Sequence, residues 1–200
     1  HFSLEAQRYI FTAGEGNEQL ASLLPTGPTM QRRPLQMVLV KFNTPYAFFA
    51  HCIDNGTNPR ITITTHPSVD GKTVWYLGGQ IAEEGIHRTS EQQIDIAKKE
   101  LQTLLPWVDL KEAQWASFFI NRAEPKQPGG KRPETYFAQA IGNAIIGWPT
   151  KLALSPLLAD AAIAILKDQS ILPSPIPKEP LPGGLERPNV AQAPWEEYFG

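Results

Sequence analysis

The sequence has little cysteine, no long apolar run and no marked excess of charge. Cys52 is its one cysteine, so disulfides within the chain are excluded and a cytoplasmic location is expected. No stretch approaches the roughly 18 apolar residues that a membrane-spanning helix needs, so no membrane span is expected. The net charge is −2, and no run of like charges exceeds three residues, which argues against a nucleic-acid or anionic-membrane surface.

Proline, in contrast, is abundant, and it is concentrated near the C-terminus. The sequence has 19 prolines, of which seven follow Leu172, with Gly183-Gly184 among them. Proline removes the backbone donor that helices and sheets need. We therefore expect this tail to lack regular structure. It is predicted either to hang free or to follow the surface in a polyproline-like form, held by Trp195, Tyr198 and Phe199.

The N-terminal part predicts a strand followed by a short helix. Residues 7–13 are almost wholly apolar, which is typical of a strand buried on both faces. Residues 17–24 then predict a helix with Asn17 as its N-cap, ended by Pro25 and Gly27.

Residues 35–79 predict an antiparallel meander of about four strands. The clearest pair is a hairpin, because Arg60–His66 alternates between isoleucine and threonine and Asp70-Gly71 is typical of a turn. Such a sheet has one packed face and one face that is free to cover a ligand. The expected strands are residues 35–41, 46–50, 60–66 and 73–79.

The next part predicts a helix and then two further strands. Residues 90–105 carry an apolar stripe at helical spacing, and Ser90 with Gln93 forms a predicted capping box. Residues 116–122 and 135–141 are expected to be strands, separated by a loop rich in glycine and proline.

Residues 142–156 predict a strand, a glycine-containing turn and a helix start. Residues 144–146 are a short apolar strand that Gly147 is expected to break. Ser155 as N-cap and Pro156 at the first helical position predict a helix that runs to about Lys167. A helix N-terminus placed in this way suits an anion or an electron-rich ring, although an ordinary strand-to-helix connection has the same pattern.

Two of these stretches together resemble a known enzyme family. Arg8–Gly14 is an apolar strand ending in Thr-Ala-Gly, and Gly142–Pro156 is a strand, glycine, loop and helix start that ends in Leu-x-Pro. Taken together they resemble the D-amino-acid-oxidase/glycine-oxidase family of FAD-dependent oxidoreductases. The resemblance implies that FAD is the cofactor and that the flavin is contacted by Thr12, Ala13, Gly14, Gly147, Trp148, Pro149, Thr150, Lys151 and Leu152.

The N-terminal dinucleotide-binding part of that family is missing from the sequence. No Gly-x-Gly-x-x-Gly turn follows a strand, and the chain begins at His1 without methionine. We therefore expect the chain to be the C-terminal part of a longer flavoenzyme. A missing N-terminal segment would supply most FAD contacts, so this chain alone is expected to be inactive and not to retain FAD.

Two residues are predicted to bind a substrate. In the resembled family an arginine at a strand end pairs with the substrate carboxylate, and Arg122 is the matching residue here, with Arg132-Pro133 as the competing match. Glu124 is an alternative partner for the Arg122 guanidinium, and a surface arginine at a strand end has the same pattern. Trp75 is predicted to line the pocket, and Lys151 to place positive charge near the flavin.

These predictions amount to an α+β fold with an antiparallel or mixed sheet flanked by helices. The expected segments are a remnant of an FAD-binding domain at 1–30, a substrate-binding sheet with its helix at 31–135, a flavin-closing strand–loop–helix at 136–170 and the tail at 171–200. The implied reaction is oxidation of an amine or amino-acid C–N bond by hydride transfer to flavin. The alternative is a non-catalytic binding or assembly module with a docking tail. No metal site is expected, because His51, Cys52, Asp54, His66 and His87 match no zinc spacing.

Overall fold

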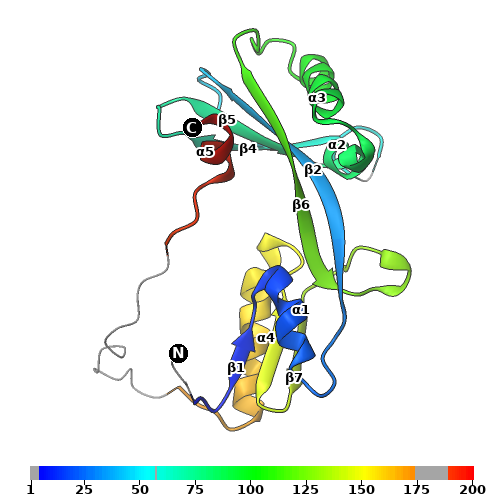
Figure 1. The fold of residues 1–200 in the computed structure, drawn as a ribbon, viewed down its shortest axis with the longest axis vertical. Coiled ribbons are helices and arrows are strands. Elements are labelled where there is room, and N and C mark those ends of the chain that lie inside the picture. The colour runs from blue at the N-terminus through cyan, green and yellow to red at the C-terminus, as the bar shows by residue number, and fades with distance from the viewer. Residues whose placement is uncertain (1–4, 57, 174–188) are drawn as a thin grey trace. The chain divides into compact units, whose positions relative to one another are not determined.

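The computed structural model describes residues 5–56, 58–173 and 189–200, shown in Figure 1. The chain divides into two compact units. The first unit contains residues 5–33 and 121–173, and the second contains residues 34–120 and 189–200. Two long strands, β2 (Met30–Phe42) and β6 (Gln114–Pro125), each run from one unit into the other.

The first unit contains a three-stranded mixed sheet. Its strands are β1 (Tyr9–Phe11), β8 (Ala144–Trp148) and β7 (Phe137–Ile141), in the order β1-β8-β7. β1 is parallel to β8, whereas β7 and β8 form an antiparallel pair. Helices α1 (Asn17–Ser22) and α4 (Ser155–Asp168) belong to the same unit, with short 3₁₀ helices at Gly14–Gly16, Pro128–Gly130 and Leu152–Leu154.

The second unit is built on a five-stranded sheet in the order β3-β4-β5-β2-β6. β3 (Phe49–Cys52), β4 (Ile61–Pro67) and β5 (Thr73–Gly78) pair antiparallel in sequence, and β5 also pairs antiparallel with β2. The helices of this unit are α2 (Gln80–Glu84), α3 (Ser90–Leu104) and α5 (Pro194–Phe199), with a 3₁₀ helix at Gly85–His87.

The two faces of the five-stranded sheet have different coverings. Successive strand side chains point to opposite faces, so Trp75 and Leu77 pack on one face together with Ala97 and Leu101 of α3. Tyr76 lies on the other face, which we call the second face. Its apolar residues form a smaller cluster that contains Leu35, Met37, Ala82, Phe118 and Ile120.

The structure confirms the α+β fold and the main predicted elements. Residues 35–79 do not form the predicted meander, because β2 pairs with β5 instead of with β3. The predicted hairpin is β4–β5, in which Thr64 lies opposite Tyr76, and the predicted helix at 90–105 is α3. The capping box was predicted one residue too late: the pair is Thr89 and Gln92. Gln93 is fully buried instead, where its amide donates to the carbonyl oxygens of Gln36 and Ile81.

Four further expectations are corrected. β1 is shorter than residues 7–13 and is not buried on both faces, since Ile10 is 49% exposed. Gly147 does not break β8, since its pairing with Ala138 continues the ladder to Trp148. Ser155 is inside α4 and forms no side-chain cap. Asn17 is likewise the first residue of α1, after the N-cap Gly16.

The C-terminal tail contains regular structure. Residues 194–199 form α5, with Pro194 in its first turn, where a missing backbone donor costs nothing. The tail prediction for residues 174–188 lies outside the described residues. Among the residues that are described, no helix is long and apolar enough to cross a membrane.

Candidate functional site

The two stretches that carry the family resemblance lie together in the first unit. Parallel pairing of β1 with β8 places Phe11 opposite Ile146, so Thr12 and Gly147 follow at the same end of the two strands. In open α/β sheets, ligands bind beyond the carboxyl ends of parallel strands. The sequence separates Thr12–Gly14 from Gly147–Leu152 by more than 130 residues, and the β1–β8 pairing removes that separation.

Side-chain hydrogen bonds fix the segments after these strands. The Trp148 indole Nε1 donates to the carbonyl oxygen of Gly14 at 3.1 Å. Asn17 makes a second link, because its Nδ2 donates to the Gly147 carbonyl oxygen at 2.9 Å and its Oδ1 accepts from the Ala13 backbone at 2.9 Å. The Asn17 side chain is fully buried, so both ends of its amide are used where water has no access.

The sequence interpretation missed this role of Asn17. An asparagine next to a helix start predicts an N-cap, and that pattern says nothing about a partner 130 residues away. The one indication in the sequence is that Asn17 lies three residues after Gly14, close to the predicted flavin contacts. Asn17 is a positioning residue that joins the ends of β1 and β8.

An apolar groove of about 490 Å³ borders the same strand ends. One wall is the strand pair, which contributes alternate residues of each strand, and the other wall is α4. The groove is lined by Ile10, Thr12, Ile145, Gly147, Pro149, Ser155, Leu158, Ala159, Ala162, Ile163 and Leu166.

Two of the predicted flavin contacts are glycines, and the structure requires glycine at each for a different reason. A Cβ on Gly147 would lie 2.7 Å from Leu158 Cδ1 and 3.1 Å from the Phe137 carbonyl oxygen. Close packing of α4 and β7 therefore explains Gly147 without a ligand. Gly14 has a φ of +60°, and a Cβ there would meet nothing within 4 Å, so its backbone is open and needs glycine for conformation.

The remaining predicted flavin contacts differ in orientation. Pro149 lines the groove, whereas the Trp148 side chain is buried in a cluster with Phe137 and Ile146 on the opposite face of β8. Lys151 is exposed, and Leu152 is 89% exposed. Thr150 adopts a positive φ of 60°, and its hydroxyl donates to the Thr135 carbonyl oxygen at 3.0 Å.

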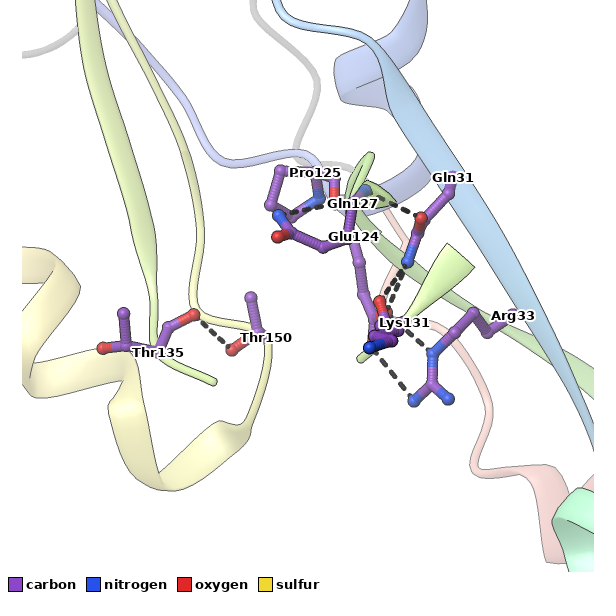
Figure 2. A network of polar contacts seen from close by, with 8 residues as sticks. All are labelled: Gln31, Arg33, Glu124, Pro125, Gln127, Lys131, Thr135 and Thr150. Carbon is purple, nitrogen blue, oxygen red and sulfur yellow. Dashed lines mark hydrogen bonds and ion pairs between the residues drawn. The ribbon is translucent and has the colours of Figure 1, made fainter. Parts of the chain in front are cut away.

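Glu124 is the buried acid of this unit, and its partner is Arg33. Figure 2 shows the network around it. Arg33 Nε donates to Glu124 Oε2 at 2.8 Å, while only 1% of the Glu124 side chain is exposed. Gln31 donates to the Lys131 carbonyl oxygen at 2.9 Å and accepts from the Gln127 backbone at 3.0 Å. The network therefore ties β2, β6 and the loop after β6 together.

The predicted substrate arginines are both in the first unit but outside the apolar groove. Arg122 is half-buried on β6 and is absent from the groove lining. Glu124, which the sequence offered as an alternative partner of Arg122, forms an ion pair with Arg33. Arg132 is exposed and lines a separate cavity of about 430 Å³ beside Lys131, Glu134 and Tyr136.

Trp75 is corrected by the structure. Its side chain is fully buried between the five-stranded sheet and α3, where it packs edge-on against Phe42 with ring centroids 4.9 Å apart. Its Nε1 donates to the Tyr46 carbonyl oxygen at 3.3 Å. Trp75 therefore stabilises the core. The neighbouring Tyr76 lies on the second face, because side chains alternate along a strand.

The second face carries a polar and aromatic group of its own. His66 Nε2 and Thr64 Oγ1 form a hydrogen bond of 2.9 Å, and the His66 ring lies edge-on to Tyr76 at 6.4 Å. Burial lowers the pKa of His66 and raises the pKa of the Tyr76 hydroxyl, so both groups favour their neutral forms. No group of three or more metal-ligating side chains occurs within the described part of the chain.

With this geometry established, comparison with known proteins identifies similar chains. No family model matches the sequence. The chain is 48% identical over 198 residues to a probable FAD-dependent oxidoreductase, PA4991, of Pseudomonas aeruginosa, and the match covers 98% of this chain and 50% of that protein. The chain thus spans about half the length of the curated relative that it matches.

Solved structures give the same relationship. The crystal structure of the FAD-dependent oxidoreductase PA4991 superposes with a TM-score of 0.86 at 48% identity, covering 98% of this chain and 54% of the other. A reduced L-α-glycerophosphate oxidase from Mycoplasma pneumoniae with FAD bound gives a TM-score of 0.51 at 16% identity, covering 80% of this chain and 42% of the other, which shows similarity of fold.

The predicted resemblance to FAD-dependent oxidoreductases is confirmed by these relatives, and FAD is the cofactor named for them.

Proposed function

We propose that this chain forms the substrate-side sheet and the flavin-closing strand–loop–helix of an FAD-dependent oxidoreductase that oxidises a C–N bond of an amine or amino acid. The observation that carries the proposal is the parallel β1–β8 pair. It brings Thr12–Gly14 and Gly147–Pro149, the two stretches of the family resemblance, to one end of one sheet. The 48% identity to the P. aeruginosa protein supports the assignment of FAD.

The residues at the ends of β1 and β8 fit the flavin ring of FAD. The backbone at Gly14 is open, and Thr12 and Pro149 border an apolar groove, which suits a flat ring that approaches the main chain closely. The sequence contains no glycine-rich turn for the pyrophosphate, so a dinucleotide-binding half outside this chain has to hold that group. FAD, when bound, supplies the hydride acceptor.

The residues of this chain act by orientation and exclusion of water. A ring bound in the groove contacts mainly apolar side chains, so its binding expels water from the strand ends and strengthens electrostatic interactions there. Arg122 is the proposed partner of a substrate carboxylate, because its planar guanidinium forms two parallel hydrogen bonds to such a group. Hydride transfer from carbon needs positioning more than an acid–base residue, so no catalytic acid is assigned.

The first test is the visible spectrum. The 200-residue chain expressed alone is expected to be colourless after gel filtration, because one loop and one strand end cannot hold the FAD pyrophosphate. The full-length protein that contains this chain is expected to be yellow and to be bleached by an amine or amino-acid substrate. Stoichiometric flavin on the isolated chain, or a colourless full-length protein, contradicts the proposal.

The second test concerns the substrate arginine. In the full-length protein, Arg122→Ala is expected to raise KM for an acid-bearing amine at least tenfold with unchanged flavin content, because a charge-assisted bidentate contact contributes about 1.5–3 kcal/mol. Arg132→Ala is the matched control on the neighbouring loop. An increase in KM for Arg132→Ala alone would transfer the role to Arg132.

A further inference from the structure

The C-terminal helix α5 lies on the second face of the five-stranded sheet. Figure 1 shows α5 in red beside β4 and β5. The contact is made across a long stretch of sequence: Val69 and Glu196, which are hydrogen-bonded, are 127 residues apart. Residues 189–200 belong to the second unit, although α4, the preceding described helix, belongs to the first.

Aromatic side chains of α5 dock against aromatic side chains of the sheet. Trp195 stacks on His66 with ring centroids 4.2 Å apart and planes 19° apart. Tyr198 stacks on Phe118 at 5.1 Å and 26°, and Phe118 in turn packs against Tyr76 at 5.9 Å. Such pairs contribute energy beyond their buried area and also fix orientation.

Charged groups add specificity to this contact. Glu196 is only 8% exposed, and its carboxylate accepts from the Val69 backbone at 3.0 Å and from the Ser68 hydroxyl at 3.4 Å. A carboxylate is costly to bury unless donors surround it, so these contacts indicate a site that suits an acid at this position. The Lys41 ammonium, 3% exposed, lies 5.8 Å from the centre of the Phe199 ring.

The sequence of α5 matches the site in its spacing. Trp195, Tyr198 and Phe199 follow the i, i+3, i+4 pattern that places side chains on one side of a helix. Glu196 borders that side and is buried, whereas Glu197 points away and is exposed. One side of a single short helix thus presents three aromatic rings and one carboxylate to the sheet.

We propose that the second face is a recognition site for an aromatic–acidic helical peptide, and that the chain's own Pro194–Phe199 occupies it. The site consists of the rings of His66 and Phe118, the ammonium of Lys41 and the donors of Ser68 and Val69. It lies wholly within the second unit and does not depend on the proposed oxidoreductase function. Occupancy by α5 attaches the C-terminus to the sheet that carries Tyr76 and His66.

The test uses a labelled peptide with the sequence of Ala191–Gly200 and the 200-residue chain. In the unaltered chain the attached segment competes at high effective concentration, so the free peptide is expected to bind weakly. The double variant Trp195→Ala/Tyr198→Ala has lost its own occupant and is expected to bind the peptide at least tenfold more tightly, as measured by fluorescence anisotropy. Trp107→Ala, at a tryptophan that is 61% exposed elsewhere in the second unit, is expected to behave like the unaltered chain.

Two controls locate the peptide on the site. Adding His66→Ala to the double variant is expected to weaken peptide binding, and a peptide with alanine at the tryptophan and tyrosine positions is expected not to bind. Equal affinity of the unaltered chain and the double variant overturns the proposal, and so does the absence of binding to the double variant.

A second measurement applies without any peptide. Glu196→Ala removes the acceptor of the Val69 amide and is expected to accelerate hydrogen exchange of that amide at least tenfold, as measured by NMR. Glu197→Ala, one residue along and exposed, is the matched control and should leave that rate unchanged. An unchanged Val69 rate in Glu196→Ala also overturns the proposal.

Discussion

The two sheets of this protein differ in how completely their own unit covers them. The five-stranded sheet buries Val38, Val40, Ile63 and Leu77 beneath α3, and α5 docks on its second face. The three-stranded sheet leaves Ile10 49% exposed, and Ile163 of α4 is also 49% exposed beside the apolar groove. Both sheets expose apolar side chains on edge strands, among them Phe49 of β3 at 75% and Phe119 of β6 at 58%. The difference lies in the faces, because α3 and α5 pack on the two faces of the larger sheet, whereas an open apolar groove borders the smaller one.

The pairing pattern explains why the difference matters. Antiparallel sheets tolerate one solvated face, whereas parallel strands are normally buried on both faces within larger sheets. We therefore expect the parallel β1–β8 pair, with the groove beside it, to gain from a bound ring. The proposed flavin site lies at the ends of these two strands.

The largest expected effect is in the well-covered sheet. Trp75→Ala is expected to destabilise the second unit by about 3–5 kcal/mol, because it empties a fully buried site beneath α3. Ile163→Ala in the groove should cost less than about 1 kcal/mol, since half of that side chain is already exposed. Urea unfolding followed by NMR resolves the two units. A similar loss in the free energy of unfolding for both variants would contradict the proposed difference between the two sheets.

The buried ion pair of the first unit comes next. Glu124→Gln is expected to destabilise that unit by about 2 kcal/mol: removing one partner of a fully buried pair costs about 3–5 kcal/mol, and partial exposure of Arg33 reduces this. Glu18→Gln is the matched control, because Glu18 pairs with Arg32 at the surface and its loss should leave the unfolding midpoint nearly unchanged. Equal shifts for the two variants would contradict a special role for Glu124.

The two glycines of the candidate site provide a finer comparison. Gly147→Ala is expected to destabilise the first unit by about 1–3 kcal/mol, because its Cβ would overlap Leu158 and the Phe137 carbonyl oxygen. Gly14→Ala meets no atom and should cost about 1 kcal/mol for its left-handed backbone alone. In the full-length protein, Gly14→Ala is expected to lower flavin content more than Gly147→Ala does, because of these two glycines only Gly14 has backbone that is open to a ligand. Flavin loss from neither variant would separate both glycines from the cofactor.

The smallest effect concerns pH and the second face. Burial holds the pKa of His66 below its ordinary value of 6.5, so the folded state favours the neutral ring. Between the lower pKa of His66 in the folded chain and its ordinary value of 6.5 in the unfolded chain, the unfolded chain binds more protons. The free energy of unfolding therefore decreases as the pH falls from about 6.5 through the folded pKa. His66→Gln should show a smaller loss of stability between pH 7.5 and 5.5. An identical pH profile for this variant would contradict the assignment.

A separate change is expected at lower pH. A hydrogen bond from Lys41 holds the pKa of Asp70 below its usual range. The folded pKa is depressed, so the contribution of Asp70 to stability is present above the unfolded value and is lost as pH falls through the folded one. Asp70→Asn should remove this acid-range change and leave the change near pH 6.5 intact, as measured by chemical unfolding across the pH range.

The sequence was most informative where local chemistry decides local structure. Alternating isoleucine and threonine, followed by Asp70-Gly71, predicted the β4–β5 hairpin, and the apolar stripe of 90–105 predicted α3. The Thr-Ala-Gly strand end and the strand–glycine–helix stretch indicated an FAD-dependent oxidoreductase, and the similar proteins are FAD-dependent oxidoreductases. The aromatic residues Trp195, Tyr198 and Phe199 were expected to hold the tail, and each contacts the second unit.

Side-chain partners, in contrast, were decided by tertiary structure alone. Nothing near Asn17 in the sequence indicates that its amide joins Ala13 to Gly147, and nothing near Glu124 indicates Arg33, 91 residues earlier. Trp75 and Tyr76 are equally aromatic, and only the sheet register decides which ring packs against α3 and which packs on the second face. The physical reason is that propensity and periodicity act over a few neighbouring residues, whereas burial and hydrogen-bond pairing depend on which distant segments pack together.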